Sequence, residues 1–137
     1  MDSKGFLSSL ATVLMTADLE ATAQFYRSVM GFRAVLYPDA EDPFAAMYRN
    51  QAELLAVQAK HGEIIPNRVR YGAGYDVYIV TGNVDSDVDA LHQEITAKRG
   101  TIVHPPRLTS YGSYEFVVED NEGRWIGIGR RRTDEAV

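Results

Sequence analysis

The stretch MTADLEATAQFYRSVMGF, residues 15–32, decides the fold because it encodes one complete helix with its own start and stop signals. The carboxylate of Asp18 can cap the start, and Gly31 can supply a left-handed stop. Apolar residues between them recur at spacings of four, three and four along one helical face: Leu19, Ala23, Tyr26 and Met30. The stretch therefore predicts an amphipathic helix that buries this face.

A second helix signal lies in VDSDVDALHQEITAKRG, residues 84–100. Asp85 or Ser86 can cap this helix, Gly100 can end it, and its apolar face consists of Val88, Leu91 and Ile95. Asp18 and Asp85 lie 67 positions apart (85 − 18). Each helix follows an apolar strand-like run and precedes three further β-like runs, so the sequence predicts a βαβββ unit that occurs twice.

The predicted strands divide the chain into two modules, at about residues 6–60 and 75–130, joined by a linker at residues 61–74. The strands are expected at residues 6–15, 33–37, 44–49 and 53–58, and then at 76–80, 101–104, 113–119 and 124–129. The linker contains Pro66 and several glycines and is too short to separate independent domains. We therefore expect one domain over residues 1–137, of the α+β class.

The composition limits the possible functions. A chain of 137 residues with 45% hydrophobic residues can bury one core, and no run of the sequence is long and apolar enough for a membrane span. The formal net charge of −5 argues against a nucleic-acid partner and suits a cationic or neutral small-molecule ligand. Because cysteine is absent, disulfides and thiolate metal sites are excluded, and a cytoplasmic location is the simplest expectation.

Three groups of residues carry a family resemblance. They are DL at 18–19 with FY at 25–26 and MGF at 30–32, then VD at 84–85 leading to Leu91, and finally YGSYEF at 111–116 before DNEG at 120–123. Together they resemble the vicinal oxygen chelate superfamily of glyoxalases, bleomycin-resistance proteins and extradiol dioxygenases, above all its small antibiotic-resistance-like members. The resemblance covers nearly the whole chain. It implies that the two βαβββ modules form a curled mixed sheet around a cleft, and that the protein pairs as a homodimer with a shared cleft.

The resemblance also implies where a metal would be bound. Metal-dependent members place His or Gln, Glu, His and Glu on four strands, and here the matching positions hold Ala11, Glu53, about Asp76, and Gly127. Two carboxylates without an imidazole make a poor zinc or iron site, so we predict no metal and no cofactor. The alternative is a metal-dependent lyase or dioxygenase with an unusual site, built from Glu53, Asp76, His104 and Glu115.

The same register predicts the ligand-binding residues. If Ala11 and Gly127 face the cleft, Val13 and Trp125 face it too, because alternate residues of a strand share a face. The two small residues leave room, and Trp125 offers a flat surface for an aromatic or cationic group. Other candidates lie on or beside the strands that line the cleft, with packing as the competing interpretation for each tyrosine: Phe44, Met47, Tyr48, Tyr78, Tyr111 and Tyr114.

These residues lead to a prediction of function. We expect a metal-free small-molecule binding protein that sequesters a flat or cationic antibiotic-like ligand and needs affinity but no chemistry. An interaction scaffold, in which side chains fill the cleft, is the third possibility.

Overall fold

Residues 4–131, which the computed structural model describes, form the βαβββ order twice. The first module consists of β1 (Thr12–Thr16), α1 (Leu19–Ser28), β2 (Arg33–Tyr37), β3 (Phe44–Arg49) and β4 (Ala52–Gln58). The second consists of β5 (Val77–Val80), α3 (Asp85–Ala97), β6 (Thr101–Leu108), β7 (Tyr114–Glu119) and β8 (Trp125–Gly129). A short helix, α2 (Asn67–Tyr71), lies in the linker and was not predicted.

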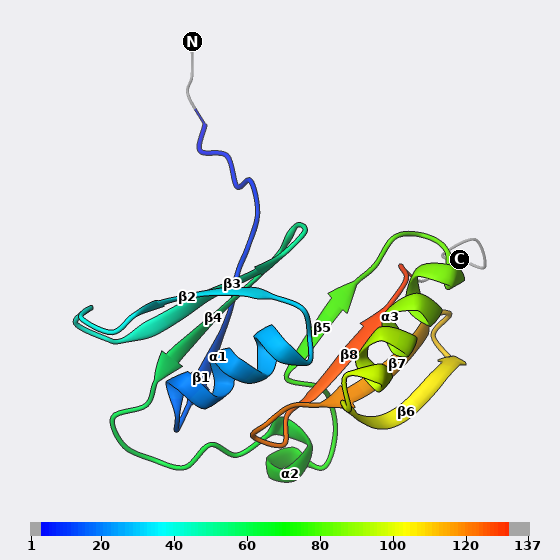
Figure 1. The fold of residues 1–137 in the computed structure, drawn as a ribbon. Helices are drawn as coiled ribbons and strands as arrows, with labels where there is room; N and C mark the ends of the chain where they lie inside the picture. Colours follow the sequence, from blue (N-terminus) through cyan, green and yellow to red (C-terminus); the bar gives the residue numbers. More distant parts are fainter. Residues whose placement is uncertain (1–3, 132–137) are drawn as a thin grey trace.

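Each module is a four-stranded mixed sheet with one long helix packed on it (Figure 1). The strand order is β1-β4-β3-β2 in the first sheet and β5-β8-β7-β6 in the second. In both, the edge strand that precedes the helix runs parallel to the last strand, and the other pairs are antiparallel. The repeated topology confirms the predicted α+β class with two βαβββ modules.

The first helix forms as the sequence predicts. The Oδ1 atom of Asp18 accepts a hydrogen bond from the backbone N–H of Ala21 at 3.1 Å, which caps the helix start. All four apolar residues of the predicted face are buried, and Gly31 follows with φ +73°. This helix is therefore held on its sheet by the face that the spacing identified.

The start of α3 differs from the prediction. Val84 is the capping residue and makes no side-chain cap, whereas Asp85 is the first residue of the helix itself. The carboxylate of Asp85 instead accepts a hydrogen bond from Nε of Arg130 at 2.5 Å, a partner that lies at the end of β8. Val88 and Ile95 are buried as expected.

Two strand boundaries also differ. β1 begins at Thr12, and Phe6, Leu7 and Leu10 before it are at least 82% exposed because no neighbouring strand pairs with them. β6 continues to Leu108, beyond the predicted end at His104. Its pairing with β7 shifts register between His104 and Arg107, and this irregular edge accommodates two prolines that have no N–H to donate.

Alternation along the strands gives each sheet a helix face and an opposite face, which we call the open face. Leu14, Met47 and Leu54 belong to the core on the helix face of the first sheet, and Ile126 and Ile128 do so in the second. Because neighbouring residues point to opposite sides, the open face of the second sheet contains Tyr78, Val80, Glu115, Val117, Trp125, Gly127 and Gly129.

A buried polar group, which we call the module tie, joins the two modules through Tyr26, Asp120 and Arg124. The Tyr26 hydroxyl on α1 donates to Oδ2 of Asp120 at 2.8 Å, and Nη1 of Arg124 donates to the same oxygen at 3.0 Å. Nη2 of Arg124 also donates to the backbone carbonyl of Met15. Burial raises the pKa of Tyr26, so its hydroxyl keeps the proton that it donates.

A second contact between the modules lies nearer the surface. Nη1 and Nη2 of Arg49 donate to the two carboxylate oxygens of Glu94 on α3, at 2.7 and 2.8 Å. Lys98 adds a contact to the same carboxylate at 3.2 Å. The hydrogen bond from Arg49 is the main cause that lowers the pKa of Glu94 to about 2.

Replacing Glu94 with glutamine is expected to lower the free energy of unfolding by about 0.5–1 kcal/mol near neutral pH, because water screens this partly exposed pair. The folded-state pKa of about 2 lies below the ordinary 4.5, so the wild type loses this contribution as the pH falls through that interval. Urea unfolding near pH 7 and again near pH 3 should show the gap between wild type and E94Q narrowing in acid. An equal difference in unfolding free energy at both pH values would contradict the stabilising role given to the Arg49–Glu94 pair.

Among residues 4–131, none of the helices combines the length and the apolar character needed to cross a membrane.

Candidate functional site

Three tyrosine hydroxyls converge on one buried carboxylate on the open face of the second sheet. Oε1 of Glu115 accepts from the hydroxyls of Tyr111 at 2.7 Å and Tyr78 at 3.0 Å. Oε2 accepts from the hydroxyl of Tyr75 at 2.5 Å. The Tyr78 hydroxyl also lies 2.5 Å from Oγ of Ser113. We call these five residues the Glu115 cluster.

Two glycines of β8 make room for this cluster. A Cβ atom on Gly127 would lie 2.7 Å from a ring carbon of Tyr78 and 3.0 Å from one of Tyr75. A Cβ atom on Gly129 would lie 2.7 Å from Cβ of Glu115. Gly127 therefore leaves space above β8, as the sequence predicted, but the rings of Tyr78 and Tyr75 fill that space.

The cluster keeps its hydroxyl protons. Burial is the main cause that raises the pKa of Tyr78 to about 12, and burial also raises the pKa values of Tyr75 and Tyr111. All three hydroxyls thus stay protonated near neutral pH and act as donors to the carboxylate. No lysine or arginine among residues 4–131 forms an ion pair with Glu115, whose side chain is fully buried.

A cavity of about 340 Å³ opens beside the Glu115 cluster. Besides Tyr75, Tyr78, Tyr111 and Ser113 it is lined by Val80, Arg130 and Arg131. The guanidinium of Arg130 is already held by Asp85 and by the carbonyl of Gly112. The cavity therefore combines two arginines with aromatic walls whose hydroxyls bind a buried carboxylate.

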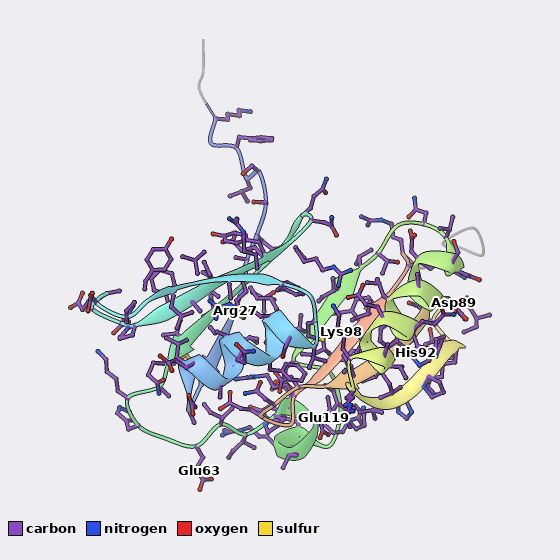
Figure 2. All side chains as sticks on the ribbon, viewed as in Figure 1. Arg27, Glu63, Asp89, His92, Lys98 and Glu119 are labelled. Atoms are coloured by element: carbon purple, nitrogen blue, oxygen red, sulfur yellow. The ribbon has the colours of Figure 1, made fainter. Side chains whose placement is uncertain are left out.

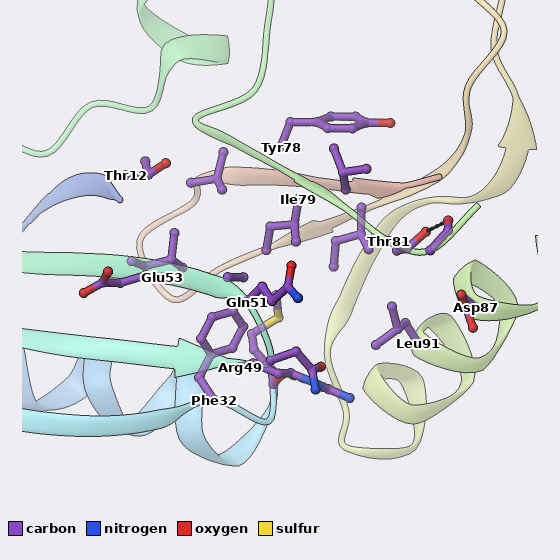
Figure 3. Close-up of a pocket in the computed structure, with 18 of the residues that line it drawn as sticks. Thr12, Phe32, Arg49, Gln51, Glu53, Tyr78, Ile79, Thr81, Asp87 and Leu91 are labelled. Carbon is purple, nitrogen blue, oxygen red and sulfur yellow. Dashed lines mark hydrogen bonds between the residues drawn. The ribbon is translucent and has the colours of Figure 1, made fainter. Parts of the chain in front are cut away.

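A larger cavity of about 840 Å³ lies between the two modules (Figure 3). Figure 3 shows Phe32, Arg49 and Gln51 on one side of it and Ile79, Thr81 and Leu91 on the other. Four charged residues line it: Arg49 and Glu94, which are paired with one another, and the carboxylates of Glu53 and Asp87. We identify the smaller cavity as the candidate site because there several polar side chains converge beside an open volume, which is how ligand sites are usually built.

The structure places Trp125 on the open face but covers its ring. The guanidinium carbon of Arg68, on α2, lies 4.3 Å from the ring centroid, and His104 packs edge-on at 5.6 Å. The Arg68 guanidinium thus occupies the ring surface that the sequence analysis assigned to a ligand. Arg68 covers the Trp125 ring because the short helix α2 positions its side chain there.

Tyr114 and Met47 point away from the open faces. The Tyr114 hydroxyl donates to Oδ1 of Asp89 at 2.7 Å, and Asp89 lies on α3, as Figure 2 shows. Met47 is fully buried in the core on the helix face of the first sheet. Tyr114 immediately precedes Glu115, so the one-residue alternation of β7 sends the two side chains to opposite faces.

The remaining ligand candidates lie in the first module, and none of them lines the cavity beside the Glu115 cluster. Ala11 immediately precedes β1, and Val13 is 56% exposed on the open face of the first sheet. Phe44 stacks on Tyr37 with ring centroids 4.7 Å apart. Tyr48 lies under the guanidinium of Arg33 at 5.2 Å.

The donors present do not fit the metal site of the family. Ala11 and Gly127 offer no donor atom, and Glu115 is taken by three hydroxyls. Oδ1 of Asp76 accepts from the backbone N–H of Asn67 at 3.2 Å, and His104 packs on Trp125. Within the described range, no three His, Asp or Glu side chains come close enough to hold an ion. Glu53, the fourth fallback residue, lies beside Tyr48 across the β3–β4 pair.

Sequence reasoning missed Tyr75, which is central to the cluster. It lies just before β5, at the first residue of the predicted second module, and the sequence analysis assigned it no role. The available signal was the alternation of Gly127 and Gly129 on one face of β8, since glycines inside a strand often mark a close approach of another group.

The sequence model of the Glyoxalase/Bleomycin resistance protein/Dioxygenase superfamily matches residues 9–128, and the chain belongs to this superfamily. No curated protein sequence matches the chain.

Solved structures share the fold. A glyoxylase/bleomycin resistance protein/dioxygenase domain from Frankia sp. EAN1pec aligns with a TM-score of 0.71 at 15% identity, over 95% of this chain and 96% of that one. TioX from Micromonospora sp. ML1 aligns at 0.64 and 21% identity, over 90% and 98%. A lactoylglutathione lyase from Agrobacterium tumefaciens aligns at 0.64 and 23% identity, over 93% and 96%.

Proposed function

We propose that this protein is a metal-free small-molecule binding protein of the glyoxalase and bleomycin-resistance type. Its ligand enters the cavity beside the Glu115 cluster. The observation that carries the proposal is an open volume of about 340 Å³ lined by three tyrosines whose hydroxyls all donate to one buried carboxylate. Such walls suit a flat or cationic antibiotic-like compound, which sequestration would hold by affinity alone.

The donor set supports binding over metal-dependent lyase or dioxygenase chemistry. The family positions at Ala11 and Gly127 lack donor atoms, and the rings of Tyr75 and Tyr78 fill the space above Gly127. The likeness to a lactoylglutathione lyase is at 23% identity and concerns the fold. A cytoplasmic location, supported by the absence of cysteine, is part of the proposal.

A homodimer is also part of the proposal. Val13 and Met15 of β1 are 56% and 45% exposed on the open face of the first sheet, and Tyr37 is 45% exposed on β2 at its opposite edge. Residues 4–11 run away from the body of the molecule (Figure 1) and carry uncovered Phe6 and Leu7. A second copy that covers these apolar side chains would enclose the open faces in a shared cleft, since contiguous exposed apolar surface marks interaction sites.

Replacing Val80 with arginine is expected to weaken ligand binding at least about tenfold. Val80 lines this cavity and also borders the larger one, and it is 47% exposed, so a longer cationic side chain fits without core disruption but fills the opening and repels a cation. Calorimetric titration with a panel of cationic and neutral aromatic antibiotics, using protein dialysed against a chelator, measures the affinity.

Val69→Arg is the matched control, because Val69 is 72% exposed on α2 and lines neither cavity. It should bind as the wild type does. Wild-type protein that binds no panel member, binding that the chelator abolishes, or an equal loss in V69R would refute the proposed function. Sedimentation of the same samples tests the shared cleft, which a monomer at all concentrations would contradict.

A further inference from the structure

Glu115 is a buried acidic side chain that forms no ion pair with a cationic side chain of residues 4–131. Among the described residues, the two most deeply buried acidic side chains are Glu115 and Asp120. Asp120 has Arg124 at 3.0 Å, whereas the partners of Glu115 are neutral hydroxyls. Hydroxyl groups replace the hydrogen bonds that the carboxylate loses on burial, but they leave its net charge in a medium of low dielectric constant.

The cavity beside the Glu115 cluster is where a cation that balances this carboxylate would bind. The cavity opens directly against the three tyrosines that surround Glu115. The rings of Tyr75 and Tyr78 are stacked with centroids 6.0 Å apart and an interplanar angle of 26°. Tyr111, on the loop before β7, is 49% exposed and completes an aromatic wall. Aromatic rings attract cations through their negative faces, and this attraction strengthens where water is excluded.

We propose that the Glu115 cluster is a binding site for an organic ammonium group, with methylated ammonium preferred. This inference rests on the proposed function and names the chemical class of its ligand. The aromatic rings contact the methyl groups, and the carboxylate balances the charge through the hydroxyls.

The arrangement favours this class over other cations. The tyrosine hydroxyls already donate to Glu115, so a cation that needs no directed hydrogen bonds fits better than a guanidinium. A hard metal ion requires several oxygen ligands, and the cluster offers one carboxylate. Arg130 and Arg131 also line the cavity and oppose a second positive group, so we expect the ligand to carry a single ammonium, beside the tyrosines.

The test compares choline with its carbon isostere, in which carbon replaces the ammonium nitrogen. Wild-type protein should bind choline at least about tenfold more tightly than the isostere, measured by shifts of tyrosine ring signals in NMR titrations. Glu115→Gln keeps the shape and removes the charge, and it should bring the two affinities to within about threefold. Glu63→Gln is the control, because this exposed carboxylate lies on the linker (Figure 2) and lines neither cavity, so its loss should preserve the preference.

Several results would overturn the inference. Equal binding of choline and isostere by the wild type would show that shape alone is recognised, and this comparison decides the matter even where E115Q fails to fold. A folded E115Q that keeps the choline preference would exclude Glu115 as its source. Binding of neutral aromatic antibiotics without any binding of choline would refute the ammonium site and leave the proposed function standing. Protein that binds none of these compounds would refute both.

Discussion

Replacing Asp120 with alanine is expected to lower the free energy of unfolding by about 3 kcal/mol. The change leaves the guanidinium of Arg124, whose side chain is 3% exposed, without its main partner, and it strands the fully buried hydroxyl of Tyr26. Removing one member of a buried ion pair costs about 3–5 kcal/mol. Glu122 remains 3.1 Å from Arg124, so the loss falls at the lower end of that range.

Tyr26→Phe separates the contributions within the module tie. It removes one hydrogen bond and leaves the Asp120–Arg124 pair intact, so a loss of about 1 kcal/mol is expected. Urea unfolding, followed by circular dichroism, measures both variants at the same temperature and pH. The interpretation fails if Asp120→Ala destabilises the protein no more than Tyr26→Phe does.

Replacing Gly129 with alanine is expected to destabilise the protein by about 2–3 kcal/mol and to close the candidate site. A Cβ atom there would lie 2.7 Å from Cβ of Glu115 and 2.9 Å from the backbone oxygen of Tyr114, and it would also overlap the Tyr78 hydroxyl. The Tyr114 oxygen and Cβ of Glu115 cannot rotate away, because the first is a backbone atom and the second is bonded directly to the backbone. β7 must therefore move, and we expect the hydrogen bond from the Tyr78 hydroxyl to Glu115 to break.

A glycine series provides the matched controls. In Gly127→Ala the new methyl group meets ring carbons of Tyr78 and Tyr75, which can rotate, so a smaller loss of about 1 kcal/mol is expected. In Gly5→Ala no atom of residues 4–131, apart from those of its two chain neighbours, lies within 4 Å of the new methyl group, so stability should not change. Thermal unfolding should rank the variants in that order, and a Gly129→Ala protein as stable as Gly5→Ala would contradict the packing described for the cluster.

The fold could be predicted because its signals are local. The helix face of α1, with Leu19 and Tyr26, depends on spacing within ten residues, and the strands depend on alternation over five or six. The predictions that were wrong depended on contacts between distant parts of the chain. Asp85 looked like a cap, but its carboxylate found Arg130, a partner 45 positions away that no local pattern reveals.

The site was less predictable because a one-residue change of register exchanges the two faces of a strand. The sequence grouped Tyr114 with Tyr111 and Tyr78, yet only the last two reach Glu115. Trp125 was placed on the right face, but the five-residue helix α2 that covers it with Arg68 has no strong periodic signal. Glu115 itself was considered as part of a metal site, and its tyrosine partners become visible only when β5, β7 and β8 are placed side by side.

The module tie also orders events during synthesis on the ribosome. Tyr26 lies 94 positions before Asp120, and Met15 lies 109 positions before Arg124, so both leave the exit tunnel long before their partners. The first module is therefore translated before its partners in the tie exist, and a product that terminates before Asp120 lacks every contact of the module tie.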